Sequence, residues 1–234
     1  MTEELFRADS YLKSCEAIVV SVGPEGIVLD RTVFYPSGGG QPGDSGAMTL
    51  ADGTALPILD TRKGEAGILH VPAEGTALPS PGDKVTVEID WERRHRHMRL
   101  HTAMHLLCAS IAGGVTGGQI GDGKARLDFD LAEVTFTKEE LTEKLAGLIA
   151  ADHPVMARWI SDEEMAAQPE LVRTMSVKPP SGSGKVRLME VAGVDLQPCG
   201  GTHVARTGEI GVIAVAKIEN KGKHNRRITI AFQE

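Results

Sequence analysis

The stretch Arg99-Leu-His-Thr-Ala-Met-His-Leu-Leu107 sets two histidines, His101 and His105, four residues apart among good helix formers. An α-helix has about 3.6 residues per turn, so both imidazoles leave the same face of the helix. Histidines at this spacing can share one metal ion, as they do on the helix of zinc proteases. We therefore predict a helix that is capped by Asp90 and runs to about Ile111, with the histidines on its inward face.

A second segment, Pro198-Cys-Gly-Gly-Thr-His203, offers a thiol and a third imidazole, with Cys199 and His203 in C-x3-H spacing. Its glycines let the backbone bend tightly around an ion. Three imidazoles and one thiolate together suit zinc by ligand type. Three protein ligands with an open position are typical of catalytic zinc and four of structural zinc, and the sequence leaves both alternatives open. We predict a zinc-dependent hydrolase whose site closes when the two segments meet.

The composition limits the class of protein. A chain of 234 residues, 41% of them hydrophobic and 24% charged, is ordinary for a globular protein with one large domain or two modest ones. No apolar run approaches the roughly 20 residues of a membrane-spanning helix, and the acidic, polar N-terminus does not resemble a signal peptide. Three scattered cysteines cannot form a disulfide framework. We therefore expect a protein of the reducing cytoplasm without a membrane partner.

The charge distribution bears on nucleic acid as a partner. A net charge of −7 argues against a protein that coats nucleic acid non-specifically, because affinity for phosphates follows local Lys and Arg. It does not exclude such a partner, since steering depends on where the charges lie. Each of two basic clusters is either a solvated face or a contact for phosphates. The clusters are Arg93–Arg99 and the group Lys217, Lys221, Lys223, Arg226 and Arg227.

The hydrophobic pattern predicts an α+β protein in two parts. Residues 1–90 contain short apolar runs with closely spaced turns, such as the alternating strand Lys84–Asp90, and predict a small β-barrel-like or sandwich domain. Residues 91–234 add helices to further strands, which predicts helices packed on an antiparallel sheet. Capping boxes at Thr137–Glu140 and Ser161–Glu164 open two of these helices.

A glycine-rich motif, Thr32-Val-Phe-Tyr-Pro-Ser-Gly-Gly-Gly-Gln-Pro-Gly-Asp-Ser-Gly46, lies within the β-rich part. Such a stretch can simply be a long turn between strands. Gly38-Gly-Gly-Gln41 can also form a backbone that a ligand approaches closely, with one amide side chain directed at it. Both interpretations stay open on this motif alone.

Four motifs, however, occur together in a fixed order. They are Thr32-x-Phe-Tyr-x3-Gly-Gly-Gln41, His101-Thr-Ala-x-His105-Leu-Leu, Pro198-Cys-Gly-Gly-Thr-His203, and Gly208-Glu-Ile-Gly211 followed by Lys217-Ile-Glu-Asn-Lys-Gly222. Jointly they resemble the editing domain of alanyl-tRNA synthetase and its free-standing relatives, the AlaX proteins. The resemblance runs from about Val28 to the end of the chain. The β-rich part with its glycine motif resembles the medium-length AlaX class.

The resemblance implies a hydrolase that deacylates tRNA(Ala) mischarged with serine or, as a second substrate, glycine. It also implies that Thr32 lies near the amino-acid side chain, where its hydroxyl pairs with that of serine and is left unpaired by alanine. A site built around a substrate hydroxyl discriminates well for that reason. The same resemblance implies four zinc ligands, of which some relatives lack the cysteine: His101, His105, Cys199 and His203.

Further roles follow from the resemblance. Gly39, Gly40 and Gln41 would line the pocket and fix the terminal adenosine. Zinc would anchor or polarise the aminoacyl ester, and a water held by zinc or by Gln41 would attack its carbonyl. Thr102 stands where zinc proteases have their general-base Glu, which argues against peptide hydrolysis but is tolerable for an activated ester. The residues implied to grip acceptor-stem phosphates are Lys217, Lys221, Arg226 and Arg227.

Two alternatives stay open. A zinc-stabilised module could bind tRNA without chemistry, or the specificity could be of the threonyl type, because threonyl-tRNA synthetases carry a domain with similar H-x3-H and C-x3-H motifs. The glycine motif Gly38–Gln41 and the run Gly208–Gly211 favour alanine tRNA. We expect a monomer or a weak homodimer.

Overall fold

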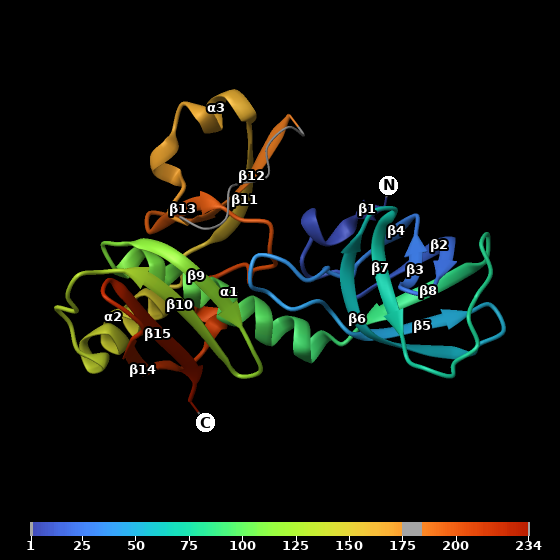
Figure 1. Ribbon diagram of the computed structural model, residues 1–234, viewed down its shortest axis with the longest axis horizontal. Helices are drawn as coiled ribbons and strands as arrows, with labels where there is room; N and C mark the ends of the chain where they lie inside the picture. Colours follow the sequence, from blue (N-terminus) through green and yellow to red (C-terminus); the bar gives the residue numbers. More distant parts are fainter. Residues whose placement is uncertain (1, 175–183, 234) are drawn as a thin grey trace. The chain divides into compact units, whose positions relative to one another are not determined.

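The computed structural model describes residues 2–174 and 184–233 (Figure 1). The chain divides into two compact units, Met1–His95 and Arg96–Glu234, and the division falls within helix α1 (Trp91–Ser110). Sheets dominate both units, and three α-helices occur among the described residues, which confirms the predicted α+β class. The domain boundary that we place after residue 90 stays a prediction.

The first unit is built around a six-stranded sheet that closes on itself in the order β2-β3-β7-β6-β5-β8. Val85, Val87 and Ile89 of β8 point into its apolar core, and the residues between them are exposed. The alternation predicted for this strand is therefore confirmed. Two short parallel strands, β1 and β4, pair beside the ring. The strands are β1 (Glu3–Glu4), β2 (Ser14–Gly23), β3 (Gly26–Leu29), β4 (Arg31–Thr32), β5 (Gly46–Leu50), β6 (Ala55–Gly64), β7 (Gly67–Pro72) and β8 (Lys84–Ile89).

The glycine-rich motif forms the long connection between β4 and β5. Gly38 and Gln41 exchange two backbone hydrogen bonds of 3.0 Å. Between them, Gly39 and Gly40 have φ angles of 58° and 85°. Positive φ at both central positions is the type I′ turn, which glycine adopts without strain. The turn alone therefore accounts for these two glycines.

A buried ion pair holds this connection in place. Arg94 and Asp44 have side-chain exposures of 0% and 1%, and Arg94 Nε donates to both carboxylate oxygens at 3.0 Å. Arg94 also donates to the carbonyls of Val33 and Ser10, and the Tyr35 N–H donates to Asp44. Buried charges are tolerated only when they are paired and hydrogen-bonded in this way. One member of the predicted basic cluster Arg93–Arg99 is therefore a core residue.

The second unit contains a four-stranded antiparallel sheet, β14-β15-β10-β9, and a three-stranded antiparallel sheet, β11-β12-β13. Two further helices, α2 (Lys138–Ala150) and α3 (Asp162–Ala166), begin at the predicted capping boxes, which are both formed. The strands are β9 (Gly114–Ile120), β10 (Lys124–Asp130), β11 (Val155–Ser161), β12 (Lys185–Val191), β13 (Asp195–Pro198), β14 (Ile213–Asn220) and β15 (Asn225–Phe232).

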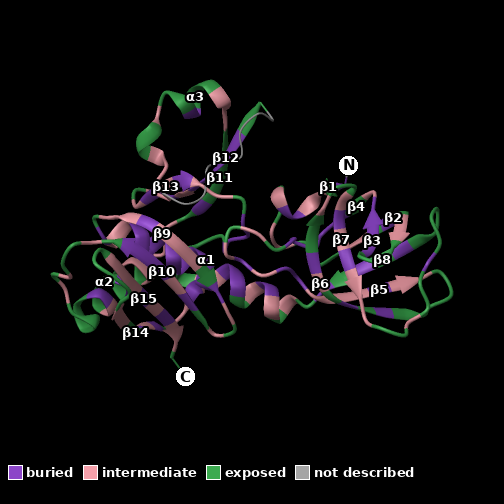
Figure 2. Cartoon of the chain, in the orientation of Figure 1, coloured by how far each residue is buried: buried purple, intermediate pink, exposed green. Residues whose placement is uncertain are grey.

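Helix α1 forms the apolar centre of this unit. Every residue from Leu100 to Cys108 is buried (Figure 2). The helix packs on β9, where a Cβ added to Gly118 would lie 3.0 Å from the end of the Met104 side chain. It begins after Asp90, whose carboxylate accepts a hydrogen bond of 3.0 Å from the Arg93 N–H. The predicted helix, its cap and its inward histidines are confirmed.

The three-stranded sheet has two different faces. Val186 and Leu188 of β12 form an apolar cluster with Met165 of α3. The residues that alternate with them, such as Met189 and Val191, are buried on the opposite face. Since successive side chains of a strand point to opposite faces, α3 covers only one side of this sheet.

Two of the strands that were not predicted are β9 and β11. β9 has the sequence Gly114-Val-Thr-Gly-Gly-Gln-Ile120, which lacks a hydrophobic alternation. β11 is the edge strand of its sheet and is exposed over most of its length, so its pattern does not alternate either. β11 pairs with the distant β12, and β9 pairs with β10 across a short hairpin turn, so the pairing and not a local alternation decides both strands.

Among the described residues, no helix is long and apolar enough to cross a membrane. The cytoplasmic setting and the monomer or weak homodimer stay predictions.

The buried pair provides a test of stability. Replacing Arg94 by Met leaves the Asp44 carboxylate buried without its cation, and we expect a loss of about 3–5 kcal/mol in the free energy of unfolding. Urea denaturation followed by circular dichroism measures this loss. Arg62→Met is the matched control, because Arg62 forms an exposed pair with Asp60 and its loss should matter far less. Equal losses in the two variants would contradict the role of the buried pair.

Candidate metal centre

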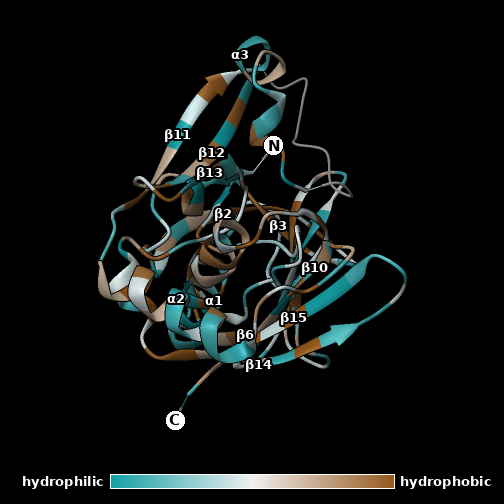
Figure 3. Ribbon diagram, turned by 90° about the vertical axis from the view of Figure 1, so that its left-hand side faces the viewer, coloured by the Kyte–Doolittle hydropathy of each residue, from teal (hydrophilic) through white to brown (hydrophobic). Residues whose placement is uncertain are grey.

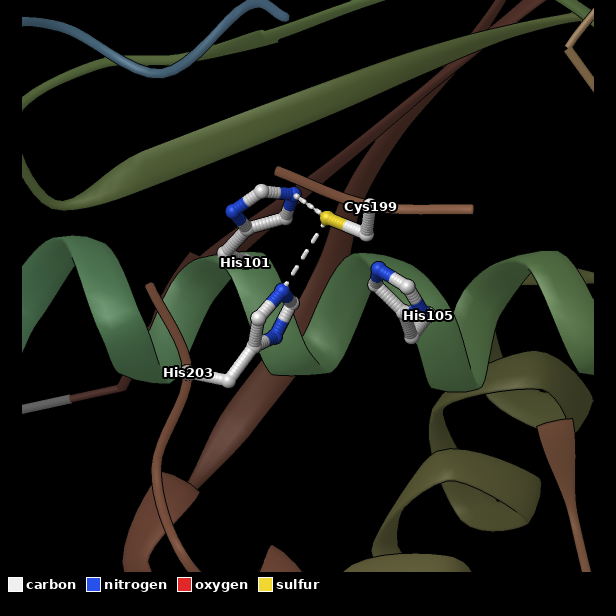
Figure 4. A group of neighbouring side chains, drawn as sticks. All are labelled: His101, His105, Cys199 and His203. Atoms are coloured by element: carbon white, nitrogen blue, oxygen red, sulfur yellow. Dashed lines mark hydrogen bonds between the residues drawn. The ribbon is translucent and has the colours of Figure 1, made fainter. Parts of the chain in front are cut away.

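Four donor side chains gather in the second unit. His101 and His105 come from α1, and Cys199 and His203 come from the loop after β13 (Figure 4). One donor atom from each residue lies within 4.8 Å of the others. The structure therefore brings together the two segments that the sequence analysis expects to meet.

The Cys199 sulfur lies between two imidazoles. Its Sγ is 3.5 Å from Nε2 of His101 and 3.2 Å from Nε2 of His203 (Figure 4). The rings of His101 and His203 are close neighbours as well, with centroids 4.3 Å apart. The donor atoms thus converge on one point.

Arg187 of β12 fixes the loop that carries the sulfur. The Cys199 N–H donates to the Arg187 carbonyl at 3.1 Å, which extends the antiparallel pairing of β12 and β13 by one residue. In return, Nη1 of Arg187 donates to the carbonyls of Cys199 and Gly201 at 2.9 and 3.0 Å. The turn around the two glycines is therefore held by a buried guanidinium.

His105 is oriented by a carboxylate. Its Nδ1–H donates to Oδ2 of Asp195 at 2.8 Å, and the Gln197 amide donates to the same oxygen at 2.7 Å. With the proton on Nδ1 held by Asp195, Nε2 is the nitrogen that His105 offers to a metal ion once the ring is neutral. A carboxylate behind a histidine is the usual support of a metal ligand, because it fixes the tautomer and the ring orientation.

His203 is oriented by a hydroxyl. Thr102 donates to the Met98 carbonyl at 3.0 Å, so its oxygen accepts the proton on Nδ1 of His203, 3.1 Å away. Nε2 of His203 then presents its lone pair toward the sulfur. Thr102, which stands where a zinc protease has its general base, serves here to support a candidate ligand.

Burial and neighbouring charges set the protonation of the group. Burial favours the neutral thiol, but the neighbouring imidazoles of His101 and His203 outweigh it and hold the pKa of Cys199 well below its usual value. Burial, and then repulsion from His101, lowers the pKa of His203. For His105, burial opposes the charge, yet Asp195 and the Cys199 thiolate raise its pKa to about 10.

These donors fit a metal ion. A thiolate and imidazole lone pairs are the forms that bind metal, and the lowered pKa values of Cys199 and His203 favour these forms. Nitrogen and sulfur donors of this kind suit a borderline metal and not a hard cation such as Mg²⁺. The cluster can therefore hold a metal ion through one thiolate and up to three imidazoles.

The supporting residues Thr102, Asp195 and Gln197 were missed by the sequence analysis. A signal for two of them is present, because Asp195, Gln197 and Cys199 follow one another at every second position. In a strand such residues share one face. Reading the strand backward from the predicted ligand Cys199 would have found them.

The predicted residue Thr32 lies in the first unit and is fully buried. Its hydroxyl donates to Nε2 of His70 at 2.8 Å and accepts from the Phe34 N–H at 3.1 Å. His70 donates from Nδ1 to the Ile27 carbonyl at 3.0 Å, and burial lowers its pKa to about 4, so it accepts as a neutral ring. A contact with a substrate hydroxyl would have to use the remaining lone pair of Thr32 or replace one of these bonds.

The other predicted residues of the glycine motif are Gly39, Gly40 and Gln41. Gln41 is 2% exposed, whereas a Cβ added to Gly39 would meet nothing within 4 Å. The turn therefore has open space beside Gly39. Roles for these residues toward a substrate stay predictions.

The two arginines of the predicted basic group have partners within the protein. Arg226 donates to Oδ1 of Asn220 at 3.0 Å and to the Gly222 carbonyl at 2.8 Å, so it ties the turn between β14 and β15. Arg227 donates twice to the Asp128 carboxylate, both times at 2.8 Å. Contacts of these two residues with phosphates stay predictions.

The two lysines of the group are more open. Lys217 and Lys221 lie 2.9 and 3.0 Å from the same carboxylate oxygen of Glu219. Figure 3 shows that the turn end of the β14–β15 hairpin, which carries them, is hydrophilic. Exposed pairs of this kind are weak and exchange readily with other charges.

Two segments of the chain match known families. Residues 186–229 match the family described as the threonyl and alanyl tRNA synthetase second additional domain. Residues 6–93 match class II (A) tRNA synthetases. Together with the His/Cys centre, these matches place the protein in a class whose segments also occur in threonyl- and alanyl-tRNA synthetases.

Full-length relatives narrow the class. The chain is 40% identical to alanyl-tRNA editing protein AlaX-M of Methanosarcina acetivorans, over 97% of this chain and 98% of the relative. It is 37% identical to AlaX-M of Saccharolobus solfataricus with the same two coverages of 97% and 98%. It is 33% identical to AlaX-L of Pyrococcus horikoshii, of which it covers 57%. The chain belongs to the AlaX family of alanyl-tRNA editing proteins, in its AlaX-M class.

The carboxylate behind His105 gives a prediction about the metal. Asp195→Asn keeps the shape but removes the charge that supports the ring, so we expect zinc affinity to fall by about 10- to 100-fold. Competition with a chromophoric chelator measures this affinity. Glu190→Gln is the matched control, because Glu190 lies on the neighbouring strand, on the opposite face, and pairs with Arg158. Equal affinities in both variants would argue against the supporting role of Asp195.

Proposed function

We propose that this protein hydrolyses the ester bond of tRNA(Ala) mischarged with serine, with glycine as a second substrate, and that a zinc ion is required. The observation that carries the proposal is the convergence of His101, His105, Cys199 and His203 within 4.8 Å, in a chain of the alanyl-tRNA editing family. Removal of a wrong amino acid from tRNA needs ester hydrolysis, which a zinc site can support.

A zinc ion held by the four donors would act as a Lewis acid toward the ester carbonyl. The protein's own residues prepare the site for it. Asp195 fixes the tautomer of His105, Thr102 fixes that of His203, and Arg187 holds the loop around Cys199. Such fixed ligands cost little reorganisation when a substrate binds.

Selection of the amino acid is assigned to Thr32, whose hydroxyl would pair with the hydroxyl of serine. Alanine has no hydroxyl to donate to the remaining lone pair of Thr32, so it would gain no such hydrogen bond. The bonds of Thr32 to His70 and to the Phe34 N–H already fix the orientation of the hydroxyl. We assign Gln41 to the orientation of the attacking water, and Gly39 and Gly40 to the terminal adenosine.

Binding of the acceptor stem is assigned to Lys217, Lys221, Arg226 and Arg227 of the β14–β15 hairpin. Contacts with phosphates position a nucleic acid without reading its sequence. The two lysines share one carboxylate, and a phosphate can displace it at little cost.

A second candidate is a zinc-stabilised module that binds tRNA without chemistry. It is favoured by the number of donors, because four protein ligands are the pattern of structural zinc. This candidate predicts stoichiometric zinc and tRNA binding without turnover.

Deacylation assays separate the candidates. We expect release of serine, and more slowly glycine, from tRNA(Ala), with alanyl-tRNA(Ala) and seryl-tRNA(Thr) left intact and with the reaction blocked by a chelator. His105→Ala should lose zinc and activity together. His95→Ala, on the same helix but stacked on Trp91, should keep both.

The outcomes of these assays are decisive. No release from any substrate would leave the binding module as the function. Release that persists in metal-free protein would contradict the zinc mechanism. Hydrolysis of seryl-tRNA(Thr) in preference to seryl-tRNA(Ala) would assign the threonyl type of specificity.

A separate test concerns Thr32. Thr32→Val keeps the shape of the side chain but removes its hydroxyl, so we expect the preference for seryl- over alanyl-tRNA(Ala), measured as the ratio of kcat/KM, to fall about tenfold. Thr32→Ser restores the hydroxyl and should restore the preference. A preference that survives in Thr32→Val would remove Thr32 from substrate selection.

A further inference from the structure

One large aromatic side chain is exposed beside the metal centre's sheet. Trp159 of the edge strand β11 is 51% exposed. It is one of two tryptophans in the chain, and the other, Trp91, stacks on His95 in the first unit. The proposed function assigns no role to Trp159.

The register of the sheet connects Trp159 with the metal donors. Trp159 lies directly opposite Arg187 on β12. Leu188 pairs with Pro198, and the Cys199 N–H donates to the Arg187 carbonyl, so Cys199 lies opposite Arg187 on the other side. Directly opposite residues point to the same face of a sheet. The three side chains therefore form one row.

The row is short. Neighbouring strands lie about 4.8 Å apart, so the Cα atoms of Trp159 and Cys199 are about 10 Å apart. The ring of Trp159 is therefore within the reach of a single nucleotide from the donor Cys199.

This face of the sheet is the one directed at α1. Gln197 and Asp195 share it with Cys199 and contact His105. α3 covers the opposite face, where it packs on Val186 and Leu188. Lys185 lies two residues before Arg187 on β12, so it points to the same face as Trp159. It is an exposed cation and pairs with Ser161. An aromatic ring and a cation thus lie together at the open end of the face that carries the donors.

We propose that Trp159 is the stacking platform for an unpaired base of the tRNA 3′ end. This inference rests on the proposed function. An aminoacyl ester is attached to the ribose of the last nucleotide, so an unpaired base must lie about one sugar away from any site that cleaves the ester. Stacking on an aromatic ring binds single strands through the face of a base and suits an end that is the same in every tRNA.

Fluorescence provides the direct test, because Trp91→Phe leaves Trp159 as the sole tryptophan. The probe is a single-stranded ACCA tetranucleotide. We expect saturable quenching of the Trp159 emission by this probe and none by an abasic tetranucleotide with the same phosphates. Tetranucleotides that lack only the terminal or only the penultimate base identify which base stacks. Equal effects of ACCA and its abasic analogue would overturn the proposal.

Kinetics provide the second test. Trp159→Ala should raise KM for seryl-tRNA(Ala) about tenfold and leave kcat nearly unchanged, and Trp159→Phe should restore KM. Met156→Ala is the matched control, because Met156 is also exposed on β11 but lies three positions away, on the opposite face. Equal KM values in Trp159→Ala and the unchanged protein would count against the proposal.

The tests separate this proposal from the proposed function. Deacylation without base-dependent quenching overturns the platform alone. Base-dependent quenching without deacylation overturns the hydrolase and leaves the platform in place. A change of Trp159 emission on dilution of the protein alone, without a probe, would show that the β11 edge binds a second copy, and that outcome also overturns the platform.

Discussion

The register between β12 and β13 is the constraint on which the metal centre depends. Because Val191 pairs with Asp195 and Leu188 with Pro198, the side chains of Asp195, Gln197 and Cys199 all leave the sheet on the side of α1. A slip by one residue would turn all three toward α3. The β12–β13 pairing thus positions the donor Cys199 together with Asp195 and Gln197, which support the donor His105.

Helix α1 meets this hairpin with a matching periodicity. His101 and His105 are one turn apart, and Thr102 lies on the adjacent line of the same helix, where it supports His203. Two donors and one supporting hydroxyl therefore come from five consecutive residues. The rigid helix sets their separation, while the loop after β13 has only to place Cys199 and His203. This division explains how a glycine-rich loop can contribute to an ordered centre.

Local patterns in the sequence predicted the structure correctly. The histidine spacing, the Asp90 cap and the capping boxes of α2 and α3 are all short-range patterns, and the structure confirms each of them. The convergence of the two donor segments was also expected, but on chemical grounds and by resemblance. The features that were not predicted depend on non-local contacts. Arg94 of α1 is buried against the loop that carries Asp44, fifty residues earlier in the chain. This contact and the pairing of β11 with β12 are tertiary, and no local pattern encodes them.

The guanidinium of Arg187 has a consequence for the order in which the protein is assembled. By bridging the carbonyls of Cys199 and Gly201, it immobilises the Cys-Gly-Gly turn through contacts that the fold itself supplies. The conformational entropy of this turn is thus lost when the chain folds and not when a metal arrives. Small zinc fingers differ, because in them the metal must order the chain around it and the apo form is unfolded. In this protein, a metal ion that binds the four donors would meet a turn that the fold already orders.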